Sequence, residues 1–353
     1  MVVWRLVPTA ATMGMIADDK VEAQALWYVD CGRAELRQEA LAGPKQGEVL
    51  VRAVFGAISR GTERLVHAGR VPESEYERMR CPRMAGAFPF PVKYGYATVG
   101  CIESGPADLR NRRVFSLHPH QSLFTVPAEA IFLLPDDVTS QRAVLAANME
   151  TALNAVWDAA PGPADRIAVV GGGVVGLLTA YICGRLPGAQ ATVVDVVPSR
   201  AQLARVLGVG FAAPDHAPVD CDLVFHASGA ADGLTTALRL AGDEASIVEL
   251  SWYGAGGVAA PLGGAFHSRR LRLVSSQVGK VALSHRARWT SARRLAAALA
   301  LLSDPVLDAL IGPACRFAQL PGKLPSIFGA ESNVVCPLIE YPAAPVQVDG
   351  AKS

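Results

Sequence analysis

Residues 166–195 contain an apolar strand, a glycine-rich turn, a helix, a second strand and a final aspartate, and this order restricts the fold more than any other feature. The turn reads Gly171-Gly172-Gly173-Val174-Val175-Gly176. Gly171 permits a tight turn, Gly173 lets the backbone approach a pyrophosphate, and Gly176 packs the helix on the sheet. The N–H groups of Val174 and Val175 lie at the positive end of the helix dipole, where a diphosphate binds favourably. The pattern predicts a dinucleotide-binding βαβ unit.

Asp195 follows the second strand at the distance from the turn that this fingerprint requires. A carboxylate there accepts hydrogen bonds from both adenosine ribose hydroxyls and repels a 2′-phosphate, which favours NAD(H) over NADP(H). Asp195 could instead cap the next helix, although Ser199 suits that role better. We expect Arg200 to stack on the adenine or, less favourably, to bind a phosphate.

The length and composition indicate a protein of two domains with large cores, because the chain has 353 residues and is 51% hydrophobic. Its 33 basic and 32 acidic residues form no dense charged run, which argues against a nucleic-acid or membrane partner and favours a small-molecule substrate. The 7 cysteines are scattered, which indicates a reducing, cytoplasmic setting. Residues 1–22 lack a long apolar stretch and are expected to be a loose N-terminal extension.

The hydrophobic pattern predicts an antiparallel β region first and alternating strands and helices later. Strands are expected at 25–29, 34–41 and 48–59, and the Pro- and Gly-rich residues 69–93 should form a long ordered loop. Helices are expected near 140–158, at 232–240 and at 286–303, where apolar side chains recur at helical spacing. The chain is therefore expected to be an α/β protein.

Three segments extend this prediction, namely 54–69 (VFGAISRGTERLVHAG), 93–100 (KYGYATVG) and 222–254. With the dinucleotide unit, they make residues 23–342 resemble the medium-chain dehydrogenase/reductase superfamily of zinc-type alcohol dehydrogenase-like proteins. The resemblance implies a GroES-like β-rich catalytic domain and a Rossmann domain with a doubly wound parallel sheet. It also implies cofactor contacts from Thr151 and Ser228. The implied boundaries are 23–149 and 281–345 for the catalytic domain, 150–280 for the Rossmann domain and 346–353 for a C-terminal tail.

A narrower resemblance rests on the segments SRGTE, GRVP, SSQVGKVA and RARWTSARRLAAAL. These are similar to the bacteriochlorophyllide a 3-hydroxyethyl dehydrogenases and the dehydrogenases around them. Substrate identity and reaction direction do not follow from these segments.

The zinc ligands of the superfamily have no counterpart in this chain. Alignment on the shared glycines and on Thr151 puts Arg60, Tyr96 and Ala147 where a Cys, a His and a Cys would bind catalytic zinc. These three side chains cannot form a zinc site, because zinc requires thiolate, imidazole or carboxylate ligands. The prediction is a metal-free, zinc-independent member.

Without zinc, another group has to polarise a carbonyl or accept an alcohol proton. Thr62 matches a hydroxyl that relays the proton in zinc-dependent relatives, and Tyr96 takes a former ligand position. Arg60 could stabilise an oxyanion, since a guanidinium remains charged. Each also has a structural alternative: Arg60 could pair with Glu63 or Glu150, and the ring of Tyr96 could pack in the wall of the cleft.

His118 and His120 flank Pro119 and are expected in a loop that faces solvent or one side of the cleft, with substrate contact as the alternative. Lys280 lies at the second domain junction, where solvation is the favoured interpretation and substrate contact the other. Residues 271–277 should form an exposed edge strand that pairs with its twin in a homodimer, as in the superfamily.

Together these features predict an NAD(H)-linked, zinc-independent oxidoreductase that interconverts a secondary alcohol and a ketone. Reduction of an enone or a quinone is an alternative, because it needs only hydride delivery to a conjugated carbon. A dinucleotide-sensing protein without catalysis is a third hypothesis, since the fingerprint is intact beside an altered pocket.

Overall fold

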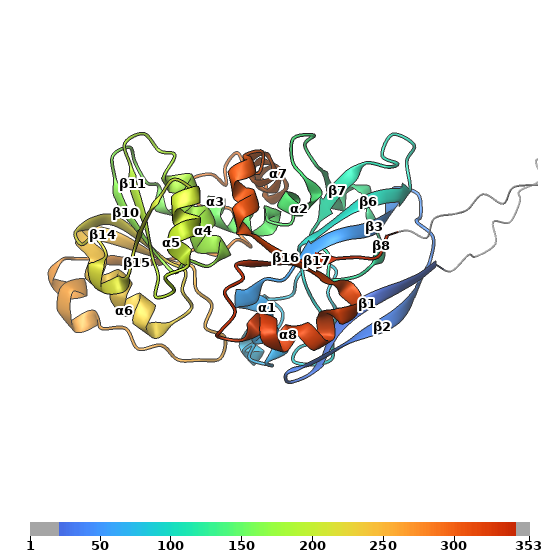
Figure 1. Ribbon diagram of the computed structural model, residues 1–353, viewed down its shortest axis with the longest axis horizontal. Coiled ribbons are helices and arrows are strands. Elements are labelled where there is room, and N and C mark those ends of the chain that lie inside the picture. The colour runs from blue at the N-terminus through green and yellow to red at the C-terminus, as the bar shows by residue number, and fades with distance from the viewer. Residues whose placement is uncertain (1–20, 344–353) are drawn as a thin grey trace, which may run out of the picture.

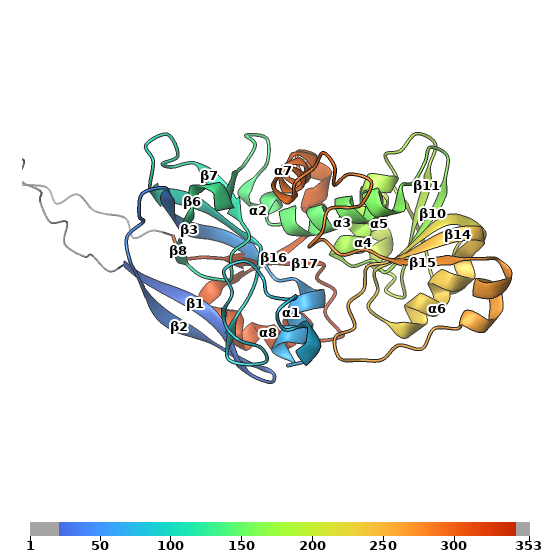
Figure 2. The same ribbon diagram turned by 180° about the vertical axis from the view of Figure 1, so that it is seen from behind.

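A computed structural model describes residues 21–343 and shows two domains side by side, joined by helices between them (Figure 1). The β-rich domain holds both ends of the described chain, and the parallel-sheet domain is formed by its middle part (Figure 2). This is the mixed α/β architecture predicted from the sequence. The predicted tail 346–353 and residues 1–20 of the predicted extension lie outside the described residues, whereas Val21 and Glu22 already belong to the first strand.

The β-rich catalytic domain contains two sheets. The smaller one has the order β2-β1-β5-β4 and is antiparallel. The larger one has the order β16-β17-β3-β6-β7-β9, with β8 also paired to β3. The strands are β1 Val21–Asp30, β2 Arg33–Leu41, β3 Glu48–Ala57, β4 Ala85–Gly86, β5 Val92–Lys93, β6 Thr98–Ser104, β7 Arg113–Ser116, β8 Leu123–Pro127, β9 Ile131–Leu133, β16 Ile311–Arg316 and β17 Cys336–Glu340.

The Rossmann domain has one parallel sheet of six strands with the order β12-β11-β10-β13-β14-β15. Its central strands are almost continuously apolar, as expected for strands covered on both faces. The strands are β10 Arg166–Val170, β11 Gln190–Val194, β12 Gly210–Ala212, β13 Cys221–His226, β14 Ala241–Glu249 and β15 Arg272–Ser275. The helices that cross between them are α4 Val174–Cys183, α5 Arg200–Val206 and α6 Ala231–Leu240.

The remaining helices are α1 Arg60–His67, α2 Ser140–Ala143, α3 Ala146–Ala159, α7 Ser291–Leu301 and α8 Leu320–Phe328. Helix α3 contacts both α4 and α7, and its buried residues belong to one core cluster together with residues of both domains. The helix expected at 140–158 is divided in two, because i→i−3 hydrogen bonds at Val144 and Leu145 tighten the end of α2. Helix α7 begins at Ser291, five residues later than expected, since the side chain of Thr290 caps the N–H of Arg293.

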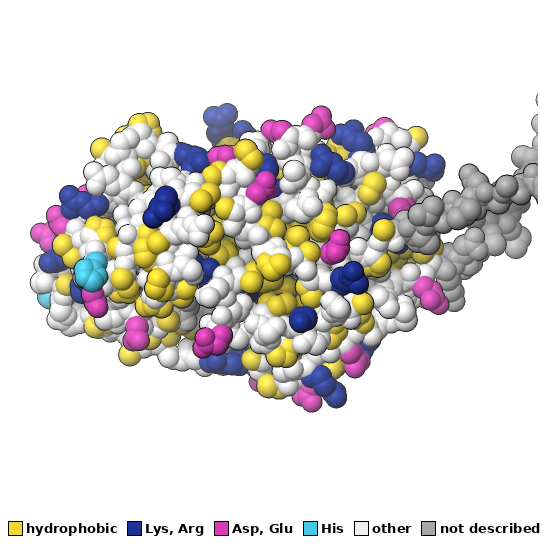
Figure 3. Space-filling view, in the orientation of Figure 1, with side chains coloured by type: hydrophobic (Ala, Val, Ile, Leu, Met, Phe, Trp, Pro, Cys, Tyr) yellow, Lys and Arg dark blue, Asp and Glu magenta, His cyan; other side chains and the backbone are white. Residues whose placement is uncertain are grey.

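Within residues 21–343, no helix has both the length and the apolar character needed to cross a membrane. On the face shown in Figure 3, hydrophobic side chains lie across the middle of the molecule, and side chains of both charge signs are interspersed around them. The residues expected to form a long ordered loop, 69–93, contain only the short strands β4 and β5 and one turn of 3₁₀ helix.

Candidate active site

The glycine-rich turn has the shape that a dinucleotide requires. Gly171 has φ +111°, and a Cβ atom there would lie 2.6 Å from the backbone nitrogen of Ser228. At Gly176 a Cβ would collide with the carbonyl oxygen of Gly171, so α4 can approach the turn only without a side chain. Gly173 is the N-cap of α4, and no atom lies within 4 Å of its missing Cβ. The open space at Gly173, in front of the N–H groups of Val174 and Val175, fits a diphosphate.

Asp195 lies at the carboxyl end of β11 and holds the turn in place. Its Oδ2 accepts a hydrogen bond from the N–H of Gly172 at 2.5 Å, and its Oδ1 accepts one from Val197 at 2.7 Å. A carboxylate retains further lone pairs when it accepts two such bonds. The geometry is therefore compatible with the ribose contact expected of Asp195.

Arg200, by contrast, does not have an exposed guanidinium on which an adenine could stack. Its guanidinium is buried and donates from Nη1 to the carbonyl of Asn333 at 2.6 Å, so it connects the Rossmann domain with the segment that follows α8. Burial lowers the pKa of this group, and the neighbouring Asp195 opposes the shift. The expected adenine or phosphate contact is thus replaced by an interdomain hydrogen bond.

Thr62 and Tyr96, both predicted to handle a proton, lie near each other. Thr62 is half-buried in the first turn of α1, and Tyr96 precedes β6. Burial, with Glu63 as the next largest influence, raises the pKa of Tyr96 to about 12, while the nearby hydroxyls of Ser59 and Thr62 act to lower it. A phenol with this pKa is protonated at neutral pH and can donate a hydrogen bond.

The β14–β15 connection brings α1 close to the carboxyl end of the parallel sheet. The N–H of Ala255 donates to the carbonyl of Arg70 at 3.0 Å, and a Cβ at Gly254 would lie 3.1 Å from Leu65 of α1. Trp252 packs against the core of the catalytic domain. Thr62 lies one turn before Leu65, so this contact places Thr62 near the carboxyl end of the parallel sheet.

Arg60 has a different role from the oxyanion stabilisation considered above. Its guanidinium donates to three backbone carbonyls in the last turn of α8 and just after it: Ile327 at 2.9 Å, Gly329 at 3.2 Å and Val334 at 2.9 Å. All three guanidinium nitrogens are used, and neither Glu63 nor Glu150 is the partner. Arg60 and Arg200 therefore hold the same segment from the two domains. Burial and, next, the charge of Arg200 lower the pKa of Arg60.

The former zinc-ligand positions contain no metal-binding side chains. Ala147 is buried in α3, and within residues 21–343 no group of three or more His, Cys, Asp or Glu side chains is arranged to hold a metal ion. Thr151, four residues further along α3, is half-buried and donates to the carbonyl of Ala147 at 3.0 Å. Its oxygen can still accept a hydrogen bond from a cofactor amide.

Glu63 is the centre of a buried polar cluster that sequence reasoning missed. Its carboxylate accepts hydrogen bonds from Tyr28 Oη at 2.7 Å and from the backbone of Ser59 at 2.8 Å, and it pairs with His120 Nε2 at 2.9 Å. Both Glu63 and His120 are fully buried, so His120 does not face solvent as expected. The only signal in the sequence was an acidic residue in the first turn of a helix, which is usually exposed.

His118 is also buried, with its ring stacked on Phe124 at 3.9 Å between centroids. Burial lowers the pKa of His118 to about 3, so it is neutral at physiological pH. Lys280 is exposed, in line with the solvated interpretation, and its carbonyl accepts a hydrogen bond from Arg294 at 3.2 Å. These placements exclude His118 and His120 from an open, solvent-facing loop.

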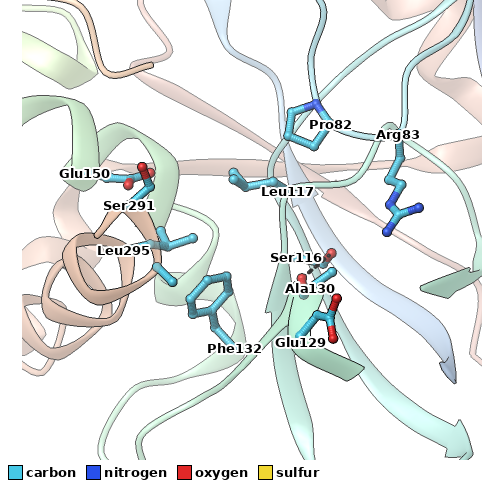
Figure 4. A pocket seen from close by; sticks show the side chains of 11 residues that line it. Pro82, Arg83, Ser116, Leu117, Glu129, Ala130, Phe132, Glu150, Ser291 and Leu295 are labelled. Atoms are coloured by element: carbon cyan, nitrogen blue, oxygen red, sulfur yellow. Dashed lines mark hydrogen bonds between the residues drawn. The ribbon is translucent and has the colours of Figure 1, made fainter. Parts of the chain in front are cut away.

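A cavity of about 210 Å³ lies between strands of the catalytic domain and helices α3 and α7 (Figure 4). Glu150 and Ser291 lie on one side of it and Arg83, from the 69–93 segment, on the other. Glu150 forms a buried ion pair with Arg294 at 3.0 Å; burial raises the pKa of Glu150 and Arg294 opposes the shift. Because Glu150 precedes Thr151 in α3, the cavity adjoins the helix that carries a predicted cofactor contact.

The fold is shared with solved dehydrogenase structures, although no family model matches the chain. L-Idonate 5-dehydrogenase from Escherichia coli has a TM-score of 0.75 at 15% identity, covering 91% of this chain and 99% of that one. Benzyl alcohol dehydrogenase from Acinetobacter calcoaceticus has a TM-score of 0.71 at 16% identity, covering 91% and 100%. TarJ from S. aureus, in complex with NADPH, has a TM-score of 0.69 at 14% identity, covering 92% and 100%.

The chain thus has the two-domain α/β fold of these three proteins over nearly its whole length. Its glycine-rich turn and Asp195 lie in the parallel-sheet domain of that fold, and their geometry is compatible with a bound dinucleotide.

Proposed function

We propose that the protein is a zinc-independent, NAD(H)-linked oxidoreductase that interconverts a secondary alcohol and a ketone. The observation that carries this proposal is the proximity of the buried Tyr96, which takes a position where zinc-dependent relatives would have a ligand, to the hydroxyl of Thr62 in α1. The pair offers a proton donor and acceptor without a metal. A bound dinucleotide would supply the hydride acceptor or donor.

Each part of the site has a distinct task in this chemistry. Val174 and Val175 would hold the diphosphate, Asp195 the adenosine ribose, and Thr151 and Ser228 the nicotinamide half. Thr62 would accept the alcohol proton during oxidation, and the protonated phenol of Tyr96 would stabilise charge on the substrate oxygen. Preference for NAD(H) rests on the negative charge of Asp195, which a 2′-phosphate would meet at close range.

The 210 Å³ cavity is the candidate for part of the substrate site. Arg83, Ser116 and Ser291 supply polar contacts, and Leu117 and Phe132 supply apolar ones. This mixed lining suits an organic molecule with a charged or polar edge.

Two further properties belong to the proposal. The exposed edge strand β15 supports a homodimer, and the seven cysteines, all free, support a reducing cytoplasmic compartment. A small-molecule substrate is the expected partner, with neither nucleic acid nor membrane, because charges of both signs are interspersed.

Turnover assays with purified protein test the proposal. NADH oxidation with a panel of ketones, enones and quinones, and NAD⁺ reduction with the matching alcohols, would be followed by absorbance. Alcohol–ketone turnover in a chelator supports the proposal. Turnover of enones or quinones alone would replace it with conjugate reduction, and tight NADH binding without any turnover would replace it with dinucleotide sensing.

A further inference from the structure

A chain of three side chains lies at the carboxyl end of the parallel sheet, outside the Thr62–Tyr96 pair. His226 ends β13 and is fully buried. Its Nδ1 is 2.7 Å from Oε2 of Glu249, the last residue of β14, and its Nε2 is 2.6 Å from Oγ of Ser228. Ser228 is exposed, so this chain of hydrogen bonds runs from a buried carboxylate to a hydroxyl at the surface.

The hydrogen-bond partners show which group donates and which accepts at each step of this chain of side chains. Both oxygens of Glu249 accept hydrogen bonds, one from the N–H of Ser251 at 2.7 Å and the other from His226 Nδ1 and from Tyr253 Oη at 3.1 Å. A carboxylate only accepts, so Nδ1 carries the proton and Nε2 is the acceptor. The hydroxyl of Ser228 therefore donates to Nε2, and its oxygen can accept a proton from outside.

The surrounding backbone holds Ser228 in this position. The N–H of Ala230 donates to Ser228 Oγ at 3.2 Å, and the N–H of Gly229 donates to Ser251 Oγ at 3.0 Å. A Cβ atom at Gly233 of α6 would lie 2.7 Å from His226 Nε2, so only glycine allows α6 to pack here.

Strand order places Ser228 beside one half of a bound dinucleotide. Strand β10 lies between β11 and β13, so Asp195 and Ser228 follow strands on opposite sides of the glycine-rich turn. The contact between Gly171 and the nitrogen of Ser228 confirms that this turn adjoins the serine. If Asp195 binds the adenosine ribose, then Ser228 lies on the nicotinamide side of the diphosphate.

A Ser–His–Glu chain is also found in acyl-transfer enzymes, but the surroundings of Ser228 do not suit that chemistry. An acyl-transfer site needs backbone N–H groups directed at the developing oxyanion. Here the N–H of Gly229 is bound to Ser251, and that of Ala230 is bound to Ser228 itself. These two N–H groups are therefore not free to stabilise a tetrahedral anion, whereas Ser228 Oγ can still accept a proton.

We propose that Ser228, His226 and Glu249 form a proton relay on the nicotinamide side of the cofactor site. The relay deepens the dehydrogenase function proposed above and rests on it. When the alcohol is oxidised, its C–H electron pair leaves as hydride and its O–H bond breaks. Thr62 gives up its own hydroxyl proton to the cleft as it accepts the alcohol proton. Ser228 Oγ takes up that proton as its own passes to His226 Nε2, and Glu249 stabilises the imidazolium that forms.

Proton release on cofactor binding provides a readout that does not depend on turnover. The groups within hydrogen-bond reach of His226 are Glu249, Tyr253 and Ser251 from the β14 side and Ser228 beyond β13. The positive nicotinamide of NAD⁺ would favour the neutral imidazole, whereas uncharged dihydronicotinamide would not. We expect molecules in which this chain of side chains holds an extra proton to release it on binding NAD⁺, but not on binding NADH.

Calorimetric titration in two buffers of different ionisation enthalpy counts these protons. Ser228→Ala and His226→Gln should each lower the number of protons released with NAD⁺ to less than half that of wild type. Thr235→Ala is the matched control, because it removes an exposed hydroxyl of α6 that bonds only the Ala231 carbonyl. Variants that bind NAD⁺ and release as many protons as wild type would overturn the relay, as would wild type that releases none.

Turnover separates failure of the relay from failure of the proposed function. With an alcohol that the wild type oxidises, Ser228→Ala should lower kcat by about 10²–10⁴-fold and flatten its rise with pH. If the His226→Gln variant does not fold, the Ser228→Ala variant still tests the relay, because the Ser228 side chain is exposed. If the protein binds NAD⁺ but oxidises no alcohol, the dehydrogenase function is refuted. The number of protons released on NAD⁺ binding would still show whether Ser228, His226 and Glu249 exchange a proton.

Discussion

The carboxylate of Asp195 accepts a hydrogen bond from the backbone N–H of Gly172 at 2.5 Å, which ties the end of β11 to the glycine-rich turn. The same carboxylate bonds the N–H of Val197, so its position is fixed from two directions. A fixed negative charge beside the turn would favour ribose hydroxyls and oppose a 2′-phosphate.

Replacing this carboxylate should change the cofactor preference. Asp195→Ser removes hydrogen bonds and repulsion together, so NADH binding should weaken by about 1–3 kcal/mol while NADPH binding improves. Fluorescence titration measures both affinities, with Asp243→Ser as a control because that carboxylate is largely exposed on β14. A wild-type protein that binds NADPH more tightly than NADH would contradict the assignment.

The purified protein should contain no stoichiometric zinc, because Arg60, Tyr96 and Ala147 occupy the positions at which relatives would bind it. Elemental analysis measures the metal, and dialysis against a strong chelator should leave turnover unchanged. One tightly held zinc per chain would refute zinc independence.

The hydroxyl groups of Thr62 and Tyr96 should matter for chemistry and not for cofactor binding. Thr62→Val and Tyr96→Phe should each lower turnover by about 10²–10⁴-fold, as expected for loss of a positioned proton donor or acceptor, with the Kd of NADH unchanged. Tyr94→Phe is the matched control, because that phenol bonds the Met79 carbonyl instead. If both variants keep near-normal turnover, hydride delivery to an enone becomes the better mechanism.

Arg60 should contribute to stability more than to chemistry. Arg60→Lys replaces a rigid fork that spans three carbonyls with a single ammonium, so the free energy of unfolding should fall by about 1.5–3 kcal/mol. Chemical denaturation measures the loss, and kcat of the folded variant should stay close to wild type. Unchanged stability together with lost turnover would restore the oxyanion role for Arg60.

The edge strand β15 should mediate a homodimer. Leu273 and Val274 are 40% and 41% exposed on it, and an apolar edge of this kind pairs readily with a second copy. Val274→Asp should therefore shift the protein toward monomers in light scattering, whereas Val206→Asp, on exposed α5, should not. Wild-type protein that is monomeric at micromolar concentration would contradict the prediction.

The local pattern of the sequence was sufficient for the fold class and the cofactor turn. Glycines at 171, 173 and 176 can each be assigned a task from spacing alone, because the backbone conformation and the helix N-terminus depend on neighbouring residues. The alternation of apolar strands and helices likewise indicates a parallel sheet without knowledge of distant contacts.

The tertiary structure decided the roles of the side chains that act over long sequence distances. Arg60 meets carbonyls near residue 330, Glu63 meets Tyr28 and His120, and His226 meets Glu249. A charged or imidazole side chain is usually exposed, and only the partners that the fold brings to it determine whether it can be buried. For this reason the sequence was enough to predict a dinucleotide site at the glycine-rich turn, whereas the hydrogen bonds of Arg60 and the buried Glu63 and His226 networks became evident only from the folded chain.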